Sequence, residues 1–437
     1  MKISVIGLGK LGLPFSFFLA SKKHKVLGYD INTNIKNEIE KNSKSIEPQL
    51  NHYIKKFKKN FKFEKNIKEL INQTKITFLV LPTPSLNNGS FSNDYIMRFL
   101  KLISPYLKKK INKNHILVIT STVSPGSCEE IFIPYLKKRG LKNKIDFSLI
   151  YNPHFIAQGT TIYNLEKPDL LLLGSDNKKS YRMINKFYKD IYKPKIFKKT
   201  SLREGEISKI AINSFITSKI SFANYISQLC EVTENTDAKK VLDVIGEDKR
   251  INHKYLKIGT KYSGPCFPRD NKALSYYSRT KKITSIIPDK NDSINKIQTP
   301  RLLKILRNIA IKNKNSKIGI CGLTYKENTN IIKDSQGYDL INLIKKSPLK
   351  NNKINVYDNF LDKIEINKEG KKLNFISNKS DFIKRSDIIF IMYNLRISLP
   401  IIKTRKKKYI IDCWRCIEKV PKNYIKIDLG AYSNYIF

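Results

Sequence analysis

The chain has 437 residues, enough for two or three domains that each bury a core of their own. Its hydrophobic content of 41% and aromatic content of 11% describe an ordinary soluble globular protein. The formal net charge of +46 raises the possibility of nucleic-acid binding. However, the lysines are spread along the chain in short runs, and no DNA- or RNA-binding motif accompanies them. We therefore interpret the charge as compositional drift, with a general field that favours anionic substrates.

Membrane insertion and disulfide scaffolding are also disfavoured. No run of 18 apolar residues suggests a membrane span. Six cysteines in a chain of this length form no disulfide framework, so we expect a reducing cytoplasm. The pair Cys413 and Cys416 is a lone C-x-x-C without a second pair or nearby histidines, so we expect no metal site.

Apolar strands alternate with helix-like segments through residues 1–200, as in parallel α/β sheets. The expected strands are 2–6, 25–29, 76–81, 116–121, 147–151 and 170–173. Residues 201–233 then have apolar spacing near 3.6 without an interior proline, which predicts one long helix.

The α/β alternation restarts at residue 316, with expected strands 317–321, 354–357, 387–392 and 409–412. The chain therefore reads as two α/β, Rossmann-like doubly wound domains joined by a helical central domain with one long helix. We predict an α/β domain over 1–200, a central helical region over 201–295 and a second α/β domain over 296–437.

A dinucleotide-binding fingerprint opens the chain. An apolar strand runs directly into Gly7-Leu8-Gly9-Lys10-Leu11-Gly12, the G-x-G-x-x-G spacing that makes a tight turn, admits a pyrophosphate and packs a helix closely. Asp30 ends the next strand, where an acid accepts hydrogen bonds from the adenosine ribose and repels a 2′-phosphate. The pattern indicates NAD as cofactor.

A second informative segment is Ser263-Gly264-Pro265-Cys266-Phe267-Pro268-Arg269-Asp270. Glycine and proline beside Cys266 suggest exposed, shaped backbone, and an acid follows four residues later. A thiol that holds an aldehyde covalently allows a nicotinamide enzyme to carry out a second oxidation, to the acid. The two features together suggest a four-electron dehydrogenase.

These motifs and others, in the same order, resemble the UDP-glucose/GDP-mannose dehydrogenase family, whose thiol motif is G-G-S/P-C-F-x-K-D. The resemblance runs almost end to end. Its further motifs are Leu81-Pro82-Thr83-Pro84, Ser121-Thr122-Val123, Glu206-Ile207-Ser208-Lys209 with Asn213, Arg250-Ile251, Gly322-Leu323-Thr324-Tyr325-Lys326, and Asp412 to Arg415.

The resemblance implies roles for individual residues. Cys266 would form a thiohemiacetal and then a thioester, and Lys209 and Asn213 would stabilise the oxyanion. Asp270 would position water or tune the thiol, and Thr122 would hold a water. Cofactor contacts would come from Gly7, Gly9, Lys10, Leu11, Gly12, Asp30, Pro82, Thr83 and Thr122. Substrate contacts would come from Phe155, Lys209, Asn213, Arg250, Tyr262, Gly264, Tyr325, Lys326 and Arg415.

The chain departs from the family where N-P-E-F-x-x-E-G is usual, because it has His154 and Gln158 in place of the two glutamates. Arg269, Ser263 and Lys333 also differ from the usual residues. A histidine with an ordinary pKa of about 6.5 can act as a base at neutral pH. We therefore expect His154 to replace the glutamate; the alternative is that it is a polar filler and hydrolysis is impaired.

The resemblance implies a nucleotide-sugar 6-dehydrogenase. It would have an NAD-binding domain over 1–200, a central helical region carrying the thiol over 201–295 and a nucleotide-sugar-binding domain over 296–437. Asn152-Pro153 followed by Phe155 resembles the UDP-glucose and GDP-mannose branches more than the N-acetylhexosamine branch. We prefer UDP-glucose, with a GDP-mannose or UDP-N-acetylhexosamine dehydrogenase as alternatives. A catalytically impaired paralogue that binds nucleotide sugar or NAD is a second reading, and a basic nucleic-acid-binding protein a third. By analogy with the family, the long helix suggests a homodimer.

Overall fold

The computed structural model describes residues 1–41, 47–111, 114–157, 159–192, 196–313, 315–332, 334–361, 373–394 and 407–433. They form two compact units. The first comprises Met1–Ile212 with Ala273–Ile283, and the second comprises Asn213–Lys272 with Thr284–Phe437. Two helices, α9 (Leu202–Glu231) and α11 (Phe267–Thr280), have residues in both units.

The first unit contains a sheet of strand order β3-β2-β1-β4-β5-β6-β7-β8, parallel throughout except between β6 and β7. Strand order reverses between β1 and β4, which is where dinucleotides bind in such folds. The strands are β1 (Lys2–Ile6), β2 (Lys25–Tyr29), β3 (Phe61–Phe63), β4 (Ile76–Leu79), β5 (His115–Ile119), β6 (Phe147–Tyr151), β7 (Leu171–Ser175) and β8 (Phe197–Thr200).

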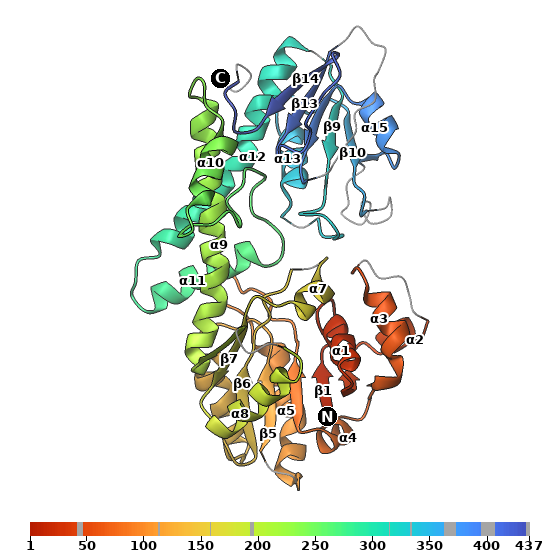
Figure 1. Cartoon of the computed structure of the whole chain (residues 1–437), viewed down its shortest axis with the longest axis vertical. Coiled ribbons are helices and arrows are strands. Elements are labelled where there is room, and N and C mark those ends of the chain that lie inside the picture. The colour runs from red at the N-terminus through yellow and green to blue at the C-terminus, as the bar shows by residue number, and fades with distance from the viewer. Residues whose placement is uncertain are drawn as a thin grey trace. The chain divides into compact units, whose positions relative to one another are not determined.

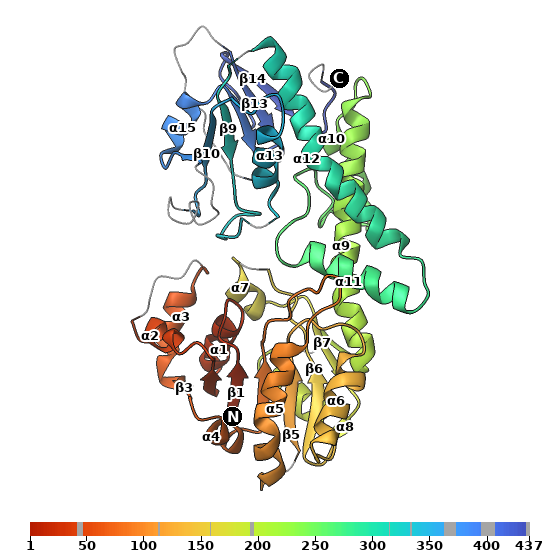
Figure 2. The same cartoon turned by 180° about the vertical axis from the view of Figure 1, so that it is seen from behind.

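Helices cover both faces of this sheet, so that Figure 1 shows α1 and α8 over one face and Figure 2 shows α5 and α6 over the other. Neighbouring strand residues point to opposite faces, so Val5 packs in one apolar core and Ile6 in the other. The helices are α1 (Gly12–Ser21), α2 (Asn34–Glu40), α3 (Leu50–Phe57), η1 (Lys58–Asn60), α4 (Ile67–Gln73), α5 (Asp94–Lys109), η2 (Ser127–Phe132), α6 (Ile133–Lys138), α7 (Thr161–Glu166) and α8 (Lys178–Lys189).

The second unit contains an all-parallel sheet of order β11-β10-β9-β12-β13-β14. Its strands are β9 (Ile318–Cys321), β10 (Ile354–Tyr357), β11 (Asn374–Phe375), β12 (Ile388–Ile391), β13 (Lys408–Asp412) and β14 (Tyr424–Asp428). Its remaining helices are α10 (Ala238–Glu247), α12 (Ile286–Lys312), α13 (Gln336–Lys345) and α15 (Lys379–Arg385). Apolar clusters lie on both faces of this sheet as well.

The two sheets repeat one local design. Gly7 after β1 and Gly322 after β9 both have positive φ, +88° and +101°. In each case a glycine at the start of the following helix packs against the carbonyl of that residue. A Cβ added to Gly12 would lie 1.7 Å from the Gly7 carbonyl oxygen, and a Cβ added to Gly337 would lie 2.5 Å from the Gly322 carbonyl oxygen. Both sheets share the Rossmann order 3-2-1-4-5-6. The predicted fold class, two doubly wound domains with a long central helix, is confirmed.

The expected strands lie within a few residues of the observed ones, and the helix expected over 201–233 is α9. Strands β3, β8, β11 and β14 were not expected. Helix α12 spans residue 295, where we predicted a domain boundary, and it continues through Pro300.

Candidate active site

The glycines of the N-terminal loop have different structural surroundings. At Gly7 an added Cβ would lie 2.4 Å from the Val80 carbonyl oxygen, and φ is positive. At Gly12 it would overlap the Gly7 carbonyl. At Gly9 nothing lies within 4 Å. Gly7 and Gly12 therefore shape the fold, whereas Gly9 keeps space open where backbone approaches a pyrophosphate in dinucleotide-binding loops.

Asp30 follows β2 and faces the glycine loop. Its Oδ2 accepts the Leu8 backbone N–H at 2.7 Å and its Oδ1 accepts the Asn32 N–H at 2.8 Å. A cavity of about 330 Å³ adjoins it. It is lined by Ile6, Gly7, Gly9, Tyr29, Asp30, Ile31, Val80, Leu81, Pro82, Tyr95, Arg98, Phe99 and Leu102. The fixed acid, the open space at Gly9 and a cavity at the strand-order reversal fit an adenosine-diphosphate group such as that of NAD.

This geometry predicts opposite effects for two similar substitutions. Gly9→Ala should leave the thermal midpoint unchanged but weaken NAD binding about tenfold or more, because its methyl group enters only the space that the pyrophosphate needs. Gly12→Ala should cost about 3 kcal/mol or more of unfolding free energy, because a methyl group cannot coexist with the Gly7 carbonyl. Calorimetric titration measures the NAD affinity of each variant, and thermal unfolding measures its stability. Equal loss of stability in the two variants would contradict this assignment.

The loops after β4 and β5 are held together near the cofactor cavity. The Thr83 hydroxyl donates to the Thr122 carbonyl at 2.7 Å. The Glu206 carboxylate of α9 accepts the backbone N–H groups of Gly126 at 2.6 Å and Cys128 at 2.9 Å. Burial raises the pKa of Glu206 although these hydrogen bonds oppose it. Glu206 thus fixes the start of η2 just after the Thr122 segment, a positioning role that the sequence motif alone did not reveal.

Lys209 lies one turn after Glu206 on α9 and is 7% exposed. Its Nζ donates to the His154 carbonyl oxygen at 2.9 Å and stands 4.7 Å from the centre of the Phe155 ring. The structure therefore brings Lys209, His154 and Phe155 together within the first unit.

The His154 imidazole has apolar surroundings. Its ring packs edge-to-face on Phe15, with centroids 4.6 Å apart. Its Nδ1 is buried and has no hydrogen-bond partner among the described residues. Burial, followed by the nearby Lys209 charge, lowers the pKa of His154 to about 3. The expectation of an ordinary histidine pKa was therefore wrong at this position. Gln158 and Lys333 lie outside the described residues.

A further side chain ties this segment down. Glu47 accepts the backbone N–H groups of Gly159 at 2.9 Å and Thr161 at 2.6 Å, and the Thr161 hydroxyl at 2.8 Å. It thereby fixes the chain between the His154 segment and α7. We did not single out Glu47 in the sequence, where it carries no pattern beyond an acid before a proline.

In the second unit, Cys266 is exposed, forms no disulfide bond and immediately precedes α11. Its carbonyl accepts the Asp270 backbone N–H at 2.8 Å. The Asp270 side chain is buried and its Oδ2 accepts the Asn213 amide at 2.6 Å, while Arg269 Nε lies 3.5 Å from its Oδ1. Asn213, Asp270 and the backbone of Cys266 are thus brought together behind an accessible thiol.

The residues before the thiol pack on the C-terminal sheet's first loop. Gly264 has φ +80°, and an added Cβ would lie 2.5 Å from the Tyr325 ring. Lys326 Nζ lies 5.7 Å from the centre of the same ring. Tyr262 is buried, its hydroxyl donates to Asp292 at 2.5 Å, and burial raises its pKa. These predicted substrate residues therefore adjoin one another through Gly264 and Tyr325.

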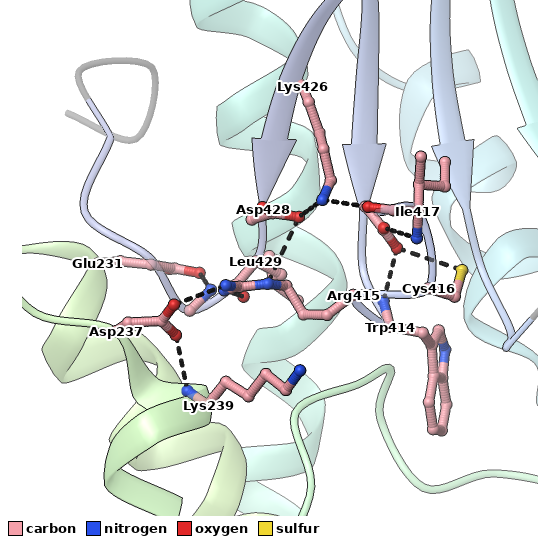
Figure 3. A network of polar contacts seen from close by, with 12 residues as sticks. Glu231, Asp237, Lys239, Trp414, Arg415, Cys416, Ile417, Lys426, Asp428 and Leu429 are labelled. Atoms are coloured by element: carbon pink, nitrogen blue, oxygen red, sulfur yellow. Dashed lines mark hydrogen bonds and ion pairs between the residues drawn. The ribbon is translucent and has the colours of Figure 1, made fainter. Parts of the chain in front are cut away.

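Two predicted substrate arginines have carboxylate partners. Arg250 is exposed and pairs with Asp248 at 2.6 Å. Arg415 lies between Asp237 at 2.7 Å and Asp428 at 3.4 Å and donates to the Leu429 carbonyl (Figure 3). Burial is the largest single influence and acts to raise the pKa of Asp237. The hydrogen bonds from Arg415 and the Lys239 backbone, with the nearby positive charges, together outweigh it and lower the pKa. In this structure Arg415 joins the start of α10 to β14, and its contact with substrate stays a prediction.

The described residues contain no cluster of three or more His, Cys, Asp or Glu side chains that suits a metal ion. None of the helices in those residues is long and apolar enough to cross a bilayer. The glycine loop, the acid after β2 and the adjoining cavity of the first sheet define the class: a dinucleotide-binding protein that carries a second Rossmann sheet.

Comparison with known proteins identifies the family. Three family models match in order: the UDP-glucose/GDP-mannose dehydrogenase family NAD binding domain at residues 1–192, its central domain at 203–296 and its UDP binding domain at 319–419. The chain is 30% identical over 400 residues to UDP-glucose 6-dehydrogenase of Rickettsia prowazekii, covering 90% of this chain and 88% of that one. It is 28% identical over 351 residues to GDP-mannose 6-dehydrogenase of Pseudomonas syringae pv. tomato, covering 79% and 78%.

The fold agrees with a solved UDP-glucose dehydrogenase structure from Pyrobaculum islandicum, with a TM-score of 0.87, 23% identity and coverage of 99% of this chain and 98% of that one. The chain belongs to the UDP-glucose/GDP-mannose dehydrogenase family. It is accordingly an NAD-dependent oxidoreductase of nucleotide sugars, as the sequence motifs predicted.

Proposed function

We propose that this enzyme oxidises the C6 alcohol of UDP-glucose to the uronic acid in two NAD-dependent steps, with Cys266 as nucleophile. The observation that carries the proposal is the exposed thiol at the start of α11, backed by the buried Asn213–Asp270 hydrogen bond. The glycine loop and Asp30 would hold NAD, and two NAD per sugar would supply the hydride acceptors for the two oxidations.

The first oxidation removes a hydride from C6 and a proton from its hydroxyl, and gives an aldehyde. The Cys266 sulfur then bonds to the aldehyde carbon, and the thiol proton passes to the carbonyl oxygen, which gives a thiohemiacetal. Loss of a second hydride and the hydroxyl proton gives a thioester. Water attacks its carbonyl carbon, the C–S bond breaks, and the acid and the thiol are released.

Lys209 and Asn213 have donors suited to oxyanion stabilisation, and we assign them that role. Lys209 Nζ already donates to the His154 carbonyl, and an ammonium group has three donors in all. Asn213 uses its amide N–H on Asp270, so Asp270 orients it. We assign Thr122 the water next to the cofactor, because Thr83 holds its backbone carbonyl and Glu206 fixes the backbone four residues later at Gly126.

We assign nucleotide-sugar binding to Phe155, Arg250, Tyr262, Gly264, Tyr325, Lys326 and Arg415, and NAD binding to Lys10, Leu11, Pro82 and Thr83 as well. Asn152-Pro153 and Phe155 set the chain nearer the UDP-glucose and GDP-mannose branches than the N-acetylhexosamine branch, and of the first two we propose UDP-glucose. We also keep the proposed domain limits of 1–200, 201–295 and 296–437, and a reducing cytoplasm as the setting.

One experiment tests the activity. The purified protein is incubated with NAD and, separately, UDP-glucose, GDP-mannose and a UDP-N-acetylhexosamine, and NADH is counted per sugar consumed. Two NADH per UDP-glucose, with the uronic acid as product, is the expected result. No NADH with any sugar would refute the proposal and leave a binding protein. One NADH per sugar, with the sugar retained on Cys266, indicates a stalled thiohemiacetal. A single burst of two NADH per enzyme, with the sugar retained on Cys266, indicates a stalled thioester.

A stalled or slow enzyme is the second candidate, and one observation favours it. The position where the family has a glutamate carries His154, whose imidazole is packed on Phe15 with a lowered pKa. The geometry therefore disfavours the expected replacement of the glutamate by a histidine base. We assign His154 a positioning role instead, because its backbone carbonyl accepts a hydrogen bond from the Lys209 ammonium group.

We also propose that the enzyme is a homodimer through α9. Phe215, Phe222, Tyr225 and Leu229 are all exposed, by 68%, 45%, 54% and 50%. Their spacing of seven, three and four residues puts them on one stripe of the helix, the pattern by which two helices pack on each other. A second copy of the same stripe would cover them.

The double variant Tyr225→Lys/Leu229→Lys should halve the mass measured by light scattering, because two copies would then bring four ammonium groups together in an apolar seam. Ile311→Lys, at the exposed end of α12, introduces a lysine at an exposed apolar position outside the stripe and should leave the mass unchanged. A wild-type protein that is monomeric at every concentration would contradict the dimer.

A further inference from the structure

The backbone just before the thiol is clamped from α12. The Tyr262 N–H donates to Asn295 Oδ1 at 2.8 Å, and Asn295 Nδ2 donates to the Tyr262 carbonyl at 2.8 Å. One amide side chain therefore satisfies both backbone groups of one residue. The Tyr262 hydroxyl is bound to Asp292, one helical turn earlier, so α12 fixes Tyr262 at both ends. This leaves the loop little freedom to slide along α12.

The preceding residue is clamped from α13. The Lys261 N–H donates to Gln336 Oε1 at 2.6 Å, and the Lys261 ammonium group pairs with the Asp339 carboxylate. The two side chains are 13% and 37% exposed, so the pair is partly shielded from water. Gln336 and Asp339 both lie in the first turn of α13. The thiol loop is therefore attached directly to the start of this helix.

Helix α13 belongs to the nucleotide-binding half of the molecule. It lies within the match to the family's UDP binding domain and follows β9, the first strand of the second sheet. Gly337 at its start packs on the carbonyl of Gly322, which repeats the arrangement at the first sheet's glycine loop. In such folds ligands bind beyond the carboxyl ends of the strands, where this loop and helix meet.

A carboxylate in that turn opposes an anionic ligand unless a cation neutralises it. Lys261 supplies the cation from the thiol loop itself. The same contact thus has two effects, because it lowers the negative charge near the nucleotide crevice and fixes the loop that leads to Cys266 five residues later. Loss of the ion pair would therefore change the charge near the crevice and also release the loop.

We propose that the Lys261–Asp339 ion pair couples nucleotide binding in the C-terminal domain to the position of the Cys266 thiol. The inference rests on the proposed function in taking Cys266 as the nucleophile. Lys261 and Asp339 are positioning residues and touch no reacting atom. Because coupling free energies are reciprocal, a nucleotide whose affinity depends on the loop held by the pair must in turn shift the equilibrium position of that loop. The alkylation rate of Cys266 reports this shift.

The test measures thiol reactivity instead of turnover. The full chain is treated with iodoacetamide with and without UDP, and alkylation of the Cys266 peptide is followed by mass spectrometry. In the wild type, UDP should change the alkylation rate by about fivefold or more. In Lys261→Met and in Asp339→Asn that change should fall below about twofold, and UDP should bind several-fold more weakly to Lys261→Met by calorimetry.

Two further variants make the result specific. Lys257→Met removes an exposed lysine four residues earlier and should keep the wild-type response. The exchanged pair Lys261→Asp/Asp339→Lys should restore at least half of it, which a variant that merely loosens the fold would not do. A wild-type response in Lys261→Met and Asp339→Asn, or no UDP effect on the wild-type thiol, would overturn the proposal.

Failure of this inference and failure of the proposed function are distinguishable. UDP-dependent alkylation that needs the ion pair, in a protein that oxidises no nucleotide sugar, would refute the activity and keep the coupling. Turnover to the uronic acid with an alkylation rate indifferent to UDP would refute the coupling and keep the activity.

Discussion

Replacement of Cys266 by alanine should lower the rate of uronic acid formation by about 10³-fold or more, because a thioester can then no longer form. The first hydride transfer does not need the thiol, so a single turnover should still yield NADH and an aldehyde. The measurement is NADH per sugar by absorbance, with the product identified by mass spectrometry. Unchanged NAD affinity by calorimetry should show that the cofactor domain is intact.

The surroundings of the other cysteines sharpen this prediction. Burial raises the pKa of Cys128, Cys321 and Cys413, so these thiols are poor nucleophiles. Cys416 is only partly buried and is the best matched control. Cys416→Ser should oxidise the substrate at the wild-type rate. Acid formation by Cys266→Ala within tenfold of the wild type would show that the second oxidation proceeds without this thiol.

The sequence predicted most of the first unit because its signals are local. The strand before Gly7, the glycine spacing and Asp30 after the next strand all lie within 30 residues. The strands that the sequence did not predict lack such local signals. β3 and β11 are edge strands of three and two residues, and with one neighbour each they need no continuous apolar run.

The candidate site was harder to predict because its contacts are distant in sequence. Asn213 and Asp270 are 57 residues apart, and only the fold brings the amide onto the carboxylate. Glu206 appeared in a motif, but its hydrogen bonds to Gly126 and Cys128 cross some 80 residues. The motifs therefore identified the residue types at the site, whereas which of them orient the others follows only from packing.

His154 shows the limit of arguing from residue type. A histidine in sequence suggests a base near neutrality, because its ordinary pKa is about 6.5. In the structure the ring packs on Phe15, and its Nδ1 is buried without a partner among the described residues. Desolvation and the Lys209 charge both disfavour protonation and lower the pKa to about 3. The chemistry expected at this position changes accordingly.

The pH dependence of turnover distinguishes the two histidine roles. A base with a pKa near 6.5 is about nine-tenths protonated at pH 5.5, so a rate that depends on it falls about tenfold below its plateau. With its pKa lowered to about 3, His154 stays deprotonated throughout the neutral range. Any contribution it makes should therefore be constant from pH 5 to pH 9, measured as steady-state NADH release.

Restoring the glutamate gives the largest expected gain. His154→Glu restores the family's carboxylate within the influence of the Lys209 charge, and general-base catalysis of water attack contributes about 10²- to 10⁴-fold. We expect thioester hydrolysis to rise at least tenfold, whereas His154→Ala should stay within about threefold of the wild type. Intact-mass spectrometry during turnover should show acyl-enzyme in the wild type and little of it in His154→Glu.

The control for added charge is His52→Glu, which replaces an exposed histidine of α3 by the same carboxylate and should change neither quantity. The decisive comparison is with alanine. If His154→Ala lowered hydrolysis a hundredfold while His154→Glu gained nothing, the imidazole would be the base in spite of its lowered pKa, and water would have to reach it past Phe15. If glutamate accelerates hydrolysis and alanine does not, this enzyme releases its thioester without a side chain base at position 154, and the oxyanion contacts of Lys209 and Asn213 are the remaining catalytic contribution.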